Sequence, residues 1–555
     1  MKNLLKYFSF VNLSFVLLVH NAPAQTNRQI PHLEKRGNAT QLIVEGKPFL
    51  VLGGELHNSS TSSLDYMQPI WPKLASLNLN TALSAVSWEL IEPEEGKFDF
   101  TLVDAMLKGA RENNLRLILL WFGSWKNGLS HYAPYWVKKD FKRFPRVKLS
   151  NGKPTETITP LSPEASKSDS HAFAMFMKHL REVDSQDHSV IMIQVENEMG
   201  VIGDARDHSV VAEAGFNKNV PQELMNHLQK NKNDLQPSLK KIWTDAGSKT
   251  SGTWQDVFGK NSSADEAFMA WNYAQYIDRV VKAGKAEYPL PMFVNAWIVQ
   301  PEDKGPGDYP SGGPQSHVHD IWRAGAPQLD ILAPDIYLPD FTGITAMYHH
   351  TWNPLFIPES FADTAGASNA FYAIGHYNAI GYSPFGIDSR VEANNFIPKV
   401  YKILSGMSSE ILDAQAKGTI EAVSLNKNNP LQKINLGGYT LEAKIRSPQR
   451  RSGPIPAIGY ALIINTAPDE YTIAGYNAEI TFKPSTSGPQ TAGLAAVWEG
   501  TYVNGQWKSG RKLNGDNIMR SYNLSEEAGK NQTGTVARFD GADPEVLKIK
   551  LYRFE

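Results

Sequence analysis

The amino-acid sequence predicts an α/β protein made of a (β/α)8 TIM barrel followed by a C-terminal all-β sandwich domain. From about residue 41 to about residue 415, apolar strand-like runs alternate with amphipathic helical segments, and eight such runs can be counted. Beyond about residue 415 the chain changes to short β-rich runs without helical periodicity. At 555 residues the chain has room for two or three domains. We therefore expect a barrel over residues 25–415 and a β sandwich over residues 416–555.

The eight strand-like runs are short and apolar. They are Phe49 to Gly53, Thr81 to Val86, Arg116 to Phe122, the run from Ile191 that ends at Glu198, Pro291 to Ala296, Leu329 to Tyr337, Leu355 to Ile357, and Ala379 to Tyr382. Strands that alternate with helices pair in parallel through crossover connections, and a count of eight favours a closed barrel over an open sheet. Nucleotide binding has no support, because no Gly-x-Gly-x-x-Gly motif follows a strand and no P-loop is present.

Helices between these runs are predicted from residues that recur at helical spacing. One apolar face is made by Met67, Ile70, Trp71, Leu74 and Leu77. Further along the chain, Ser263 and Glu266 have the spacing of a capping box, which predicts the start of a long helix there.

The C-terminal part is predicted to be all-β because its apolar residues alternate with period two. Tyr439, Leu441, Ala443 and Ile445 show this alternation. Turn residues separate the short runs, a pattern that is typical of a sandwich. The segment Pro448 to Pro456 is rich in proline, glycine and arginine and is predicted to be a long loop of this domain.

The first 24 residues have the pattern of a signal peptide. Lys2 and Lys6 supply positive charge, Phe8 to Val19 is apolar, and Ala22-Pro-Ala24 is a small-residue cleavage signal. The apolar stretch is too short for a stable membrane-spanning helix, and no later stretch of 18 apolar residues exists. The sequence therefore predicts export, to the periplasm or the extracellular space, with no membrane association once the signal is cleaved.

Composition excludes several classes of function. The net charge of −2 and the pI near 6.7 argue against a nucleic-acid-binding protein, which would carry a basic domain. The chain has no cysteine, so a thiol nucleophile, a disulfide and a cysteine-ligated metal are all excluded. No histidine or aspartate cluster has metal-ligand spacing, so we expect neither a metal nor another cofactor. Nothing in the sequence assigns an oligomeric state.

Two acidic residues follow strand-like runs that are far apart in the chain. Glu198 ends the run Ile191-Met-Ile-Gln-Val-Glu-Asn-Glu198, and Glu359 ends Leu355-Phe-Ile-Pro-Glu359. Their separation of 359 − 198 = 161 residues means that only a fold that gathers distant strand ends can pair them, as a barrel does at its C-terminal face. Retaining glycoside hydrolysis needs such a pair about 5–5.5 Å apart, one to protonate the leaving oxygen and one to attack the anomeric carbon.

The neighbouring Asn197 suits the same chemistry, because its amide can donate a hydrogen bond to the sugar hydroxyl next to the anomeric carbon. The competing interpretation gives these residues no catalytic role. In it, Glu196 and Glu198 are solvated residues beyond a strand, and Glu359 is a loop charge after Pro358. The occurrence of both carboxylates at strand ends favours the catalytic interpretation.

Several motifs resemble those of one enzyme family. The run Gln194-Val-Glu-Asn-Glu-Met-Gly200 resembles the acid/base motif of retaining β-galactosidases of glycoside hydrolase family 35 and their relatives in the Asn-Glu clan (clan A) of (β/α)8 glycosidases. Trp88-Glu-Leu-Ile-Glu-Pro-Glu-Glu-Gly-Lys-Phe-Asp-Phe100 and Gly53-Gly-Glu-Leu-His57 are similar to further segments of that family. The resemblance spans about residues 41 to 400, and the chain resembles a bacterial subgroup in which a β-rich domain follows the barrel.

The resemblance implies roles for individual residues. It implies that Glu198 is the acid/base, that Glu359 is the nucleophile, and that Asn197 contacts the sugar. Two departures affect the sugar site: Glu89 replaces an asparagine, and Trp121-Phe-Gly-Ser-Trp-Lys-Asn127 replaces the segment that grips galactose in many members. The substrate contacts expected here, besides Asn197, are Glu55, Trp125, Lys126 and Tyr337.

The resulting hypothesis is a retaining exo-β-galactosidase that removes terminal β-D-galactosyl residues from oligosaccharides or polysaccharides, such as plant cell-wall side chains. One alternative is another clan A retaining β-glycosidase, namely an arabinosidase, fucosidase or glucosidase. The other is a non-catalytic carbohydrate-binding protein, which the retention of both carboxylates argues against.

Overall fold

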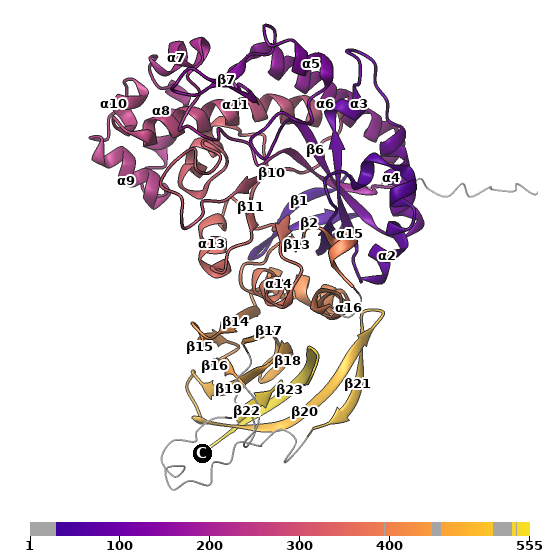
Figure 1. Ribbon diagram of the computed structural model, residues 1–555. Helices are drawn as coiled ribbons and strands as arrows, with labels where there is room; N and C mark the ends of the chain where they lie inside the picture. Colours follow the sequence, from indigo (N-terminus) through magenta and orange to yellow (C-terminus); the bar gives the residue numbers. More distant parts are fainter. Residues whose placement is uncertain (1–28, 393–394, 447–456, 514–534, 540) are drawn as a thin grey trace, which may run out of the picture.

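The computed structural model describes residues 29–392, 395–446, 457–513, 535–539 and 541–555. The predicted signal peptide (residues 1–24) and the predicted loop from Pro448 to Pro456 lie outside the described residues. Figure 1 shows two parts: a barrel with surrounding helices, and below it a smaller domain of β-strands. Within the described residues, no helix combines the length and the apolar character that a membrane span requires.

The barrel is an eight-stranded parallel sheet, which confirms the predicted fold class. Its strands are β4 (Val51–Glu55), β5 (Thr81–Ser87), β6 (Arg116–Lys126), β9 (Val190–Asn197), β10 (Met292–Trp297), β11 (Ile331–Ile336), β12 (Glu359–Ser360) and β13 (Gly381–Tyr382). The strand order is β12-β11-β10-β9-β6-β5-β4-β13. A parallel bridge between Ile357 and Tyr382 joins the two outer strands and closes the barrel.

The seventh strand differs from its predicted position. The sequence predicted it over Leu355 to Ile357, whereas β12 begins at Glu359 and pairs there with Asp335 of β11. Pro358 has no amide hydrogen to donate, so it interrupts the pairing. Ile357 therefore pairs with the strand on one side, and Glu359 pairs with the strand on the other.

A small antiparallel sheet that the sequence analysis did not predict covers the amino-terminal end of the barrel. It consists of β1 (His32–Arg36), β2 (Ala39–Val44) and β3 (Lys47–Phe49). Leu42 and Val44 of β2 belong to the same buried cluster as Leu83, Ile118 and Phe293, which come from barrel strands. Apolar packing thus fills this end of the barrel, and the polar interior is confined to the carboxyl ends of the strands.

Helices pack around the barrel. They are α1 (Leu64–Met67), α2 (Ile70–Ser76), α3 (Trp88–Ile91), α4 (Thr101–Glu112), α5 (Tyr135–Lys139), α6 (Pro163–Asp184), α7 (Val210–Phe216), α8 (Gln222–Lys230), α9 (Pro237–Asp245), α10 (Trp254–Phe258), α11 (Ser262–Glu287), α12 (His319–Gly325), α13 (Phe341–Tyr348), α14 (Thr364–His376), α15 (Ile387–Arg390) and α16 (Phe396–Lys417). Helices α7 to α10 form a group at one side of the barrel, in the connection between β9 and β10 (Figure 1).

Two helix predictions need correction. The face predicted from Met67 to Leu77 belongs to two helices, α1 and α2, which are separated at Pro69. The long helix α11 is capped by Asn261, whose side chain accepts a hydrogen bond from the backbone of Ser263, so the capping box predicted at Ser263 is wrong.

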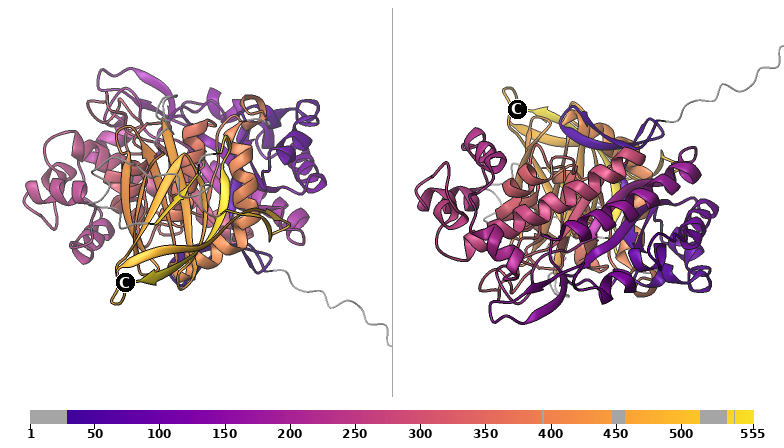
Figure 2. Two further views of the ribbon diagram at one scale, coloured as in Figure 1. Left: turned by 90° about the horizontal axis from the view of Figure 1, so that it is seen from below. Right: turned by 90° about the horizontal axis from the view of Figure 1, so that it is seen from above.

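Helices α6 and α11 lie side by side over one flank of the barrel (Figure 2, right). A Cβ atom at Gly284 of α11 would lie 2.2 Å from the ring of Phe173 in α6. Only glycine therefore permits this close approach of the two helices.

The C-terminal domain is a sandwich of two antiparallel sheets. One has the order β14-β17-β18-β23-β20-β21 and the other β15-β16-β19-β22. Their bounds are β14 (Ile420–Asn426), β15 (Leu431–Leu436), β16 (Tyr439–Ile445), β17 (Ile458–Ala467), β18 (Glu470–Tyr476), β19 (Ala478–Pro484), β20 (Thr491–Val503), β21 (Gln506–Lys512), β22 (Thr535–Arg538) and β23 (Glu545–Phe554). The alternating residues Tyr439, Leu441 and Ala443 share one buried cluster with Ile463 and Ile473 of the facing sheet.

A short two-stranded sheet, β7 (Arg146–Lys148) and β8 (Pro154–Ile158), lies in the barrel domain.

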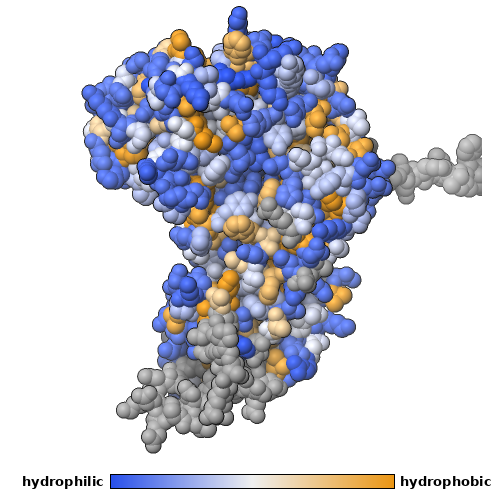
Figure 3. Space-filling model, viewed as in Figure 1, coloured by the Kyte–Doolittle hydropathy of each residue, from blue (hydrophilic) through white to orange (hydrophobic). Residues whose placement is uncertain are grey.

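The six-stranded sheet packs against α14 and α16 of the barrel domain (Figure 2, left). Tyr460 and Leu462 of this sheet belong to the same buried cluster as Phe371 of α14 and Leu404 of α16. Hydrophobic residues are also visible where the two domains meet (Figure 3). The boundary predicted at residues 415 and 416 falls inside the last turn of α16, which ends at Lys417.

Candidate active site

The carboxyl ends of six barrel strands gather a set of buried polar side chains. They are Glu55 of β4, Lys126 of β6, Asn197 with the following Glu198 at the end of β9, Asn295 of β10, Asp335 of β11 and Glu359 of β12. The structure thus brings together the two carboxylates that are 161 residues apart in the sequence. It also excludes the interpretation of Glu198 and Glu359 as solvated charges, because their exposed fractions are 6% and 5%.

The spacing of the carboxyl groups matches one of the two routes of glycoside hydrolysis. One oxygen each of Glu198, Asp335 and Glu359 lies within 4.8 Å of the other two. Retaining enzymes hold their two carboxyls about 5–5.5 Å apart, whereas inverting enzymes leave about 6.5–9.5 Å for a water molecule. The arrangement therefore supports direct attack by one carboxylate.

Three donors surround the carboxylate of Glu359. The hydroxyl of Tyr337 donates to Oε2 at 2.8 Å. The amides of Asn197 and Asn295 each lie 3.5 Å from Oε1. These contacts orient the carboxylate from three directions, and they place Tyr337 and Asn197 in the site where the sequence expected them.

Glu198 has the environment of a proton donor. Its backbone has φ of 43° and its amide donates to Oδ1 of Asn295 at 3.0 Å. Burial, and then the negative charge of Glu359, raise the pKa of Glu198 to about 7. A carboxyl group with this pKa is protonated below neutral pH and can give its proton to a leaving oxygen.

Glu55 and Lys126 add two further ionisable groups to the site. Neither carboxyl oxygen of Glu55 has a hydrogen-bond partner among the described residues, although the side chain is fully buried. Burial raises the pKa of Glu55 well above its usual range, and Glu359 adds to the effect. Burial acts to lower the pKa of Lys126, but the charges of Glu359, Glu198 and Glu55 outweigh it and raise that pKa. Both side chains lie close enough to Glu359 to interact with its charge, so they are candidates for binding hydroxyls of a ligand.

Among the described residues, one group of carboxylates has the spacing of metal ligands, namely Glu198, Asp335 and Glu359. Lys126 already places a positive charge beside these three. Burial raises the pKa of Asp335 well above its usual range, with Glu359 and Glu198 adding to it, which further reduces the negative charge that the group carries.

The structure does not bring the side chain of Trp125 together with the other predicted substrate contacts. Its side chain is fully buried, and its ring packs edge-on against Tyr273 and Tyr276 of α11 at 5.0 and 4.5 Å between centroids. The indole nitrogen donates to the carbonyl of Ile158. The cause is an irregularity at the end of β6 that turns Trp125 toward the helices and leaves Lys126 beside Asn197.

Asn295 and Asp335 lie in the site but were not among the predicted substrate contacts. The amide of Asn295 donates to Asp335 at 2.7 Å and reaches Glu359, while its oxygen accepts from the backbone of Glu198. The available signal was a polar residue near the end of the otherwise apolar run from Met292 to Trp297.

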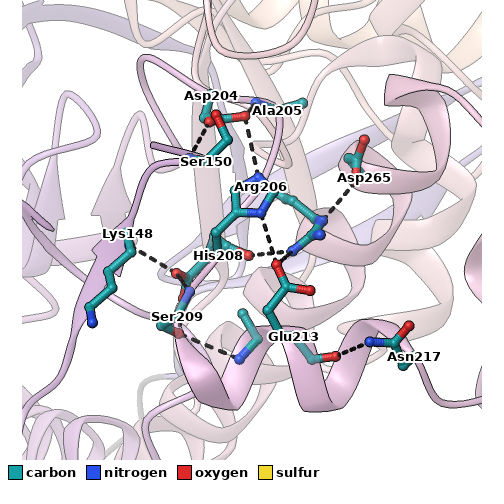
Figure 4. Close-up of polar contacts among 12 residues, drawn as sticks. Lys148, Ser150, Asp204, Ala205, Arg206, His208, Ser209, Glu213, Asn217 and Asp265 are labelled. Atoms are coloured by element: carbon teal, nitrogen blue, oxygen red, sulfur yellow. Dashed lines mark hydrogen bonds and ion pairs between the residues drawn. The ribbon is translucent and has the colours of Figure 1, made fainter. Parts of the chain in front are cut away.

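The loop that follows Glu198 is held by charged side chains (Figure 4). Arg206 is buried and donates to both Asp265 of α11 and Glu213 of α7, at 2.8 and 2.9 Å. Asp207 accepts from the backbone of Lys148 in β7 at 3.0 Å. These contacts attach the loop to three neighbouring elements just beyond the catalytic strand end.

The pKa of Glu198 makes a prediction about pH. Because this group must be protonated to act as an acid, we expect kcat/KM for a β-galactoside to be high below pH 7 and to fall as the pH rises through about 7. The charge of Lys126 lowers the pKa of Glu198, so Lys126→Met should move this basic limb to higher pH. Lys138→Met is the matched control, since Lys138 pairs with Glu89 instead. A basic limb that stays in place in Lys126→Met would contradict the assignment.

Comparison with known proteins gives two family matches. Residues 68–269 match the family described as beta-galactosidase, glycoside hydrolase family 42. Residues 397–525 match a domain of unknown function, DUF5597. The first match covers β5, β6 and β9, and it supports the resemblance to clan A β-galactosidases, whereas the resemblance to family 35 receives no support.

A beta-galactosidase from Xanthomonas manihotis is 29% identical over 214 residues, which cover 36% of this chain and 32% of that protein. The chain thus matches about a third of the length of this curated relative. Among solved structures, a beta-galactosidase from Bacillus circulans sp. alkalophilus has a TM-score of 0.44 and 16% identity, covering 66% of this chain and 57% of that chain. The catalytic domain of a beta-amylase from Paenibacillus polymyxa has a TM-score of 0.44 and 11% identity, covering 65% and 97%.

Proposed function

We propose that this protein is a retaining exo-β-galactosidase that removes terminal β-D-galactosyl residues from oligosaccharides or polysaccharides. The observation that carries the proposal is the buried pair Glu198 and Glu359. Their oxygens lie within 4.8 Å, and the pKa of Glu198 is raised to about 7. A protein that only bound carbohydrate would have no need of such a pair.

The geometry supports a double displacement. In the first step Glu359 attacks the anomeric carbon while Glu198 protonates the departing glycosidic oxygen, and a glycosyl ester forms on Glu359. In the second step Glu198, now ionised, removes a proton from a water molecule that attacks the same carbon and releases Glu359. Asn197 is the proposed donor to the 2-hydroxyl of the sugar, and the support is that its amide lies 3.5 Å from Oε1 of Glu359.

The choice of galactose is supported by the family match over residues 68–269 and by the relative described as a beta-galactosidase. Glu55, Lys126 and Tyr337 are the polar residues proposed to bind the remaining hydroxyls. A buried carboxyl group without a partner favours a ligand that pairs with it, because an unpaired buried polar group is costly.

Sugar preference is the direct test of this proposal. We expect 4-nitrophenyl β-galactoside to be hydrolysed at least about tenfold better, in kcat/KM, than the β-glucoside, which corresponds to about 1.4 kcal/mol of transition-state binding. The physical reason is that the wrong C4 epimer leaves buried polar groups unpaired. A better rate with the glucoside, arabinoside or fucoside would replace the galactosidase assignment with another clan A retaining activity.

We further propose that the protein acts outside the cytoplasm. The support is the pattern of Lys2, Lys6, the apolar run from Phe8 to Val19, and the cleavage signal at Ala22-Pro-Ala24. Detection of mature protein that begins at Gln25 in a periplasmic or culture fraction would test it, and full-length protein in the cytoplasm would contradict it.

A further inference from the structure

The end of β9 has an unusual backbone. Glu196 has φ of 63° and Glu198 has φ of 43°, so both lie in the left-handed region, which is uncommon for residues other than glycine and asparagine. Their side chains reach different parts of the barrel: that of Glu198 lies beside Glu359, while that of Glu196 contacts β6 and Asp169 of α6. Glu196 is fully buried, and the proposed chemistry does not use it.

The carboxylate of Glu196 supplies hydrogen-bond acceptors where the pairing between β6 and β9 is interrupted. Trp121 of β6 pairs with Val195, but the next paired residues are Lys126 and Asn197, so β6 has four residues where β9 has only Glu196. The backbone amides of Ser124 and Trp125 donate to the two carboxyl oxygens of Glu196 at 3.0 and 2.7 Å. A side chain thus supplies the acceptors for amides within the bulge.

Asp169 holds Glu196 from the side of the helices. The two carboxyl groups lie close together, since a Cβ atom placed at Gly123 would touch one oxygen of each. Asp169 also accepts from the indole of Trp121 at 2.9 Å, from the hydroxyl of Ser124 at 2.7 Å and from the hydroxyl of Tyr276 at 3.0 Å. Burial raises the pKa of Glu196 well above its usual range, and the charge of Asp169 adds to this.

The space between Gly123 and the carboxyl groups of Glu196 and Asp169 has no room for a further carbon atom. A Cβ atom at Gly123 would lie 2.4 Å from the indole nitrogen of Trp121, 2.6 Å from Oε1 of Glu196 and 2.8 Å from Oδ1 of Asp169. A side chain at position 123 would therefore push against the carboxyl of Glu196 and against both neighbours, Trp121 and Asp169.

We propose that Glu196, held by Asp169, is a positioning residue that aims Glu198 at the glycosidic oxygen. The amides of Asn127 and Gly128, which follow the bulge, donate to the carbonyls of Asn197 and Glu198 at 3.2 and 3.0 Å. The bulge and the catalytic residues therefore form one connected unit. This inference rests on the proposed function, because it concerns the acid of that reaction.

The test is a series of aryl β-galactosides whose leaving groups differ in acidity. Misplacement of the acid should slow poor leaving groups most, because good ones depart without protonation. For Glu196→Ala we expect kcat/KM to fall about tenfold more for the phenyl galactoside than for the 2,4-dinitrophenyl galactoside. Glu196→Gln keeps one acceptor and gains a donor for Asp169, so it should restore most of the dependence seen in the wild type.

Asp184→Ala is the matched control. Asp184 is buried and its carboxylate accepts from the amides of Ser189 and Val190, at the opposite end of β9. We expect this variant to lower the melting temperature without changing the dependence on the leaving group. Gly123→Ala displaces the carboxyl of Glu196 while all hydrogen-bonding groups remain. It should therefore also lower kcat/KM most for substrates with poor leaving groups. This variant tests the positioning role of Glu196 if Glu196→Ala does not fold.

The inference would be overturned if Glu196→Ala lowered kcat/KM equally for all leaving groups. If Glu196→Ala does not fold, the same result in Gly123→Ala would overturn it. Either result would leave the proposed function intact. A wild-type protein that cleaves none of these galactosides would overturn both.

Discussion

Replacement of Glu359 by alanine is expected to lower kcat for 4-nitrophenyl β-galactoside by about 10⁴-fold or more, because the group that forms the covalent intermediate is lost. Added azide should restore turnover by occupying the vacated space and attacking the anomeric carbon. The product of this rescue should be the α-galactosyl azide, since a single displacement inverts the configuration.

Glu442→Ala is a suitable control, because Glu442 lies on the surface of the β domain and pairs with Lys433. It should keep the activity of the wild type and show no response to azide. Formation of the β-galactosyl azide by Glu359→Ala would contradict the assignment, since it would show that another carboxylate still acts as the nucleophile.

Glu198→Ala is expected to lower kcat/KM by about 10²- to 10⁴-fold on substrates with poor leaving groups, the range that a general acid usually contributes. The 2,4-dinitrophenyl galactoside should lose far less in its first step, because its leaving group departs without a proton. The variant should also lose the basic limb near pH 7, because that limb is assigned to the raised pKa of Glu198.

A series of leaving groups checks the first expectation for Glu198→Ala, and a pH profile of kcat/KM checks the second. The wild type is the reference in both. Equal losses on good and poor leaving groups, or a basic limb that persists near pH 7, would remove Glu198 from the role of acid.

The sequence predicted most of the barrel because its physical causes are local. Apolar runs such as Arg116 to Phe122 and helical faces such as that of α2 are visible as periodicity. The location of Glu198 and Glu359 at strand ends followed from the same pattern. The N-terminal sheet was missed, because β1 to β3 are short and are stabilised by contacts with the barrel interior.

The finer arrangement of the site depends on tertiary contacts that no periodicity reveals. Trp125 and Lys126 are neighbours in the sequence, yet the bulge of β6 buries one among tyrosines and leaves the other beside the carboxylates. Asn295 has no motif of its own and gains its role only where β10 lies between β9 and β11. A pattern in one sequence predicts which face a residue lies on in a regular strand, but it does not predict where the strand becomes irregular.

The central claim is that Glu359 forms a covalent bond with the sugar. The most direct measurement is mass spectrometry of proteolytic peptides after inactivation with a 2-deoxy-2-fluoro-β-galactosyl fluoride, whose glycosyl-enzyme intermediate breaks down slowly. The account predicts one added fluorogalactosyl group, on the peptide that contains Glu359. A label on Glu198, Asp335 or any other residue would contradict it.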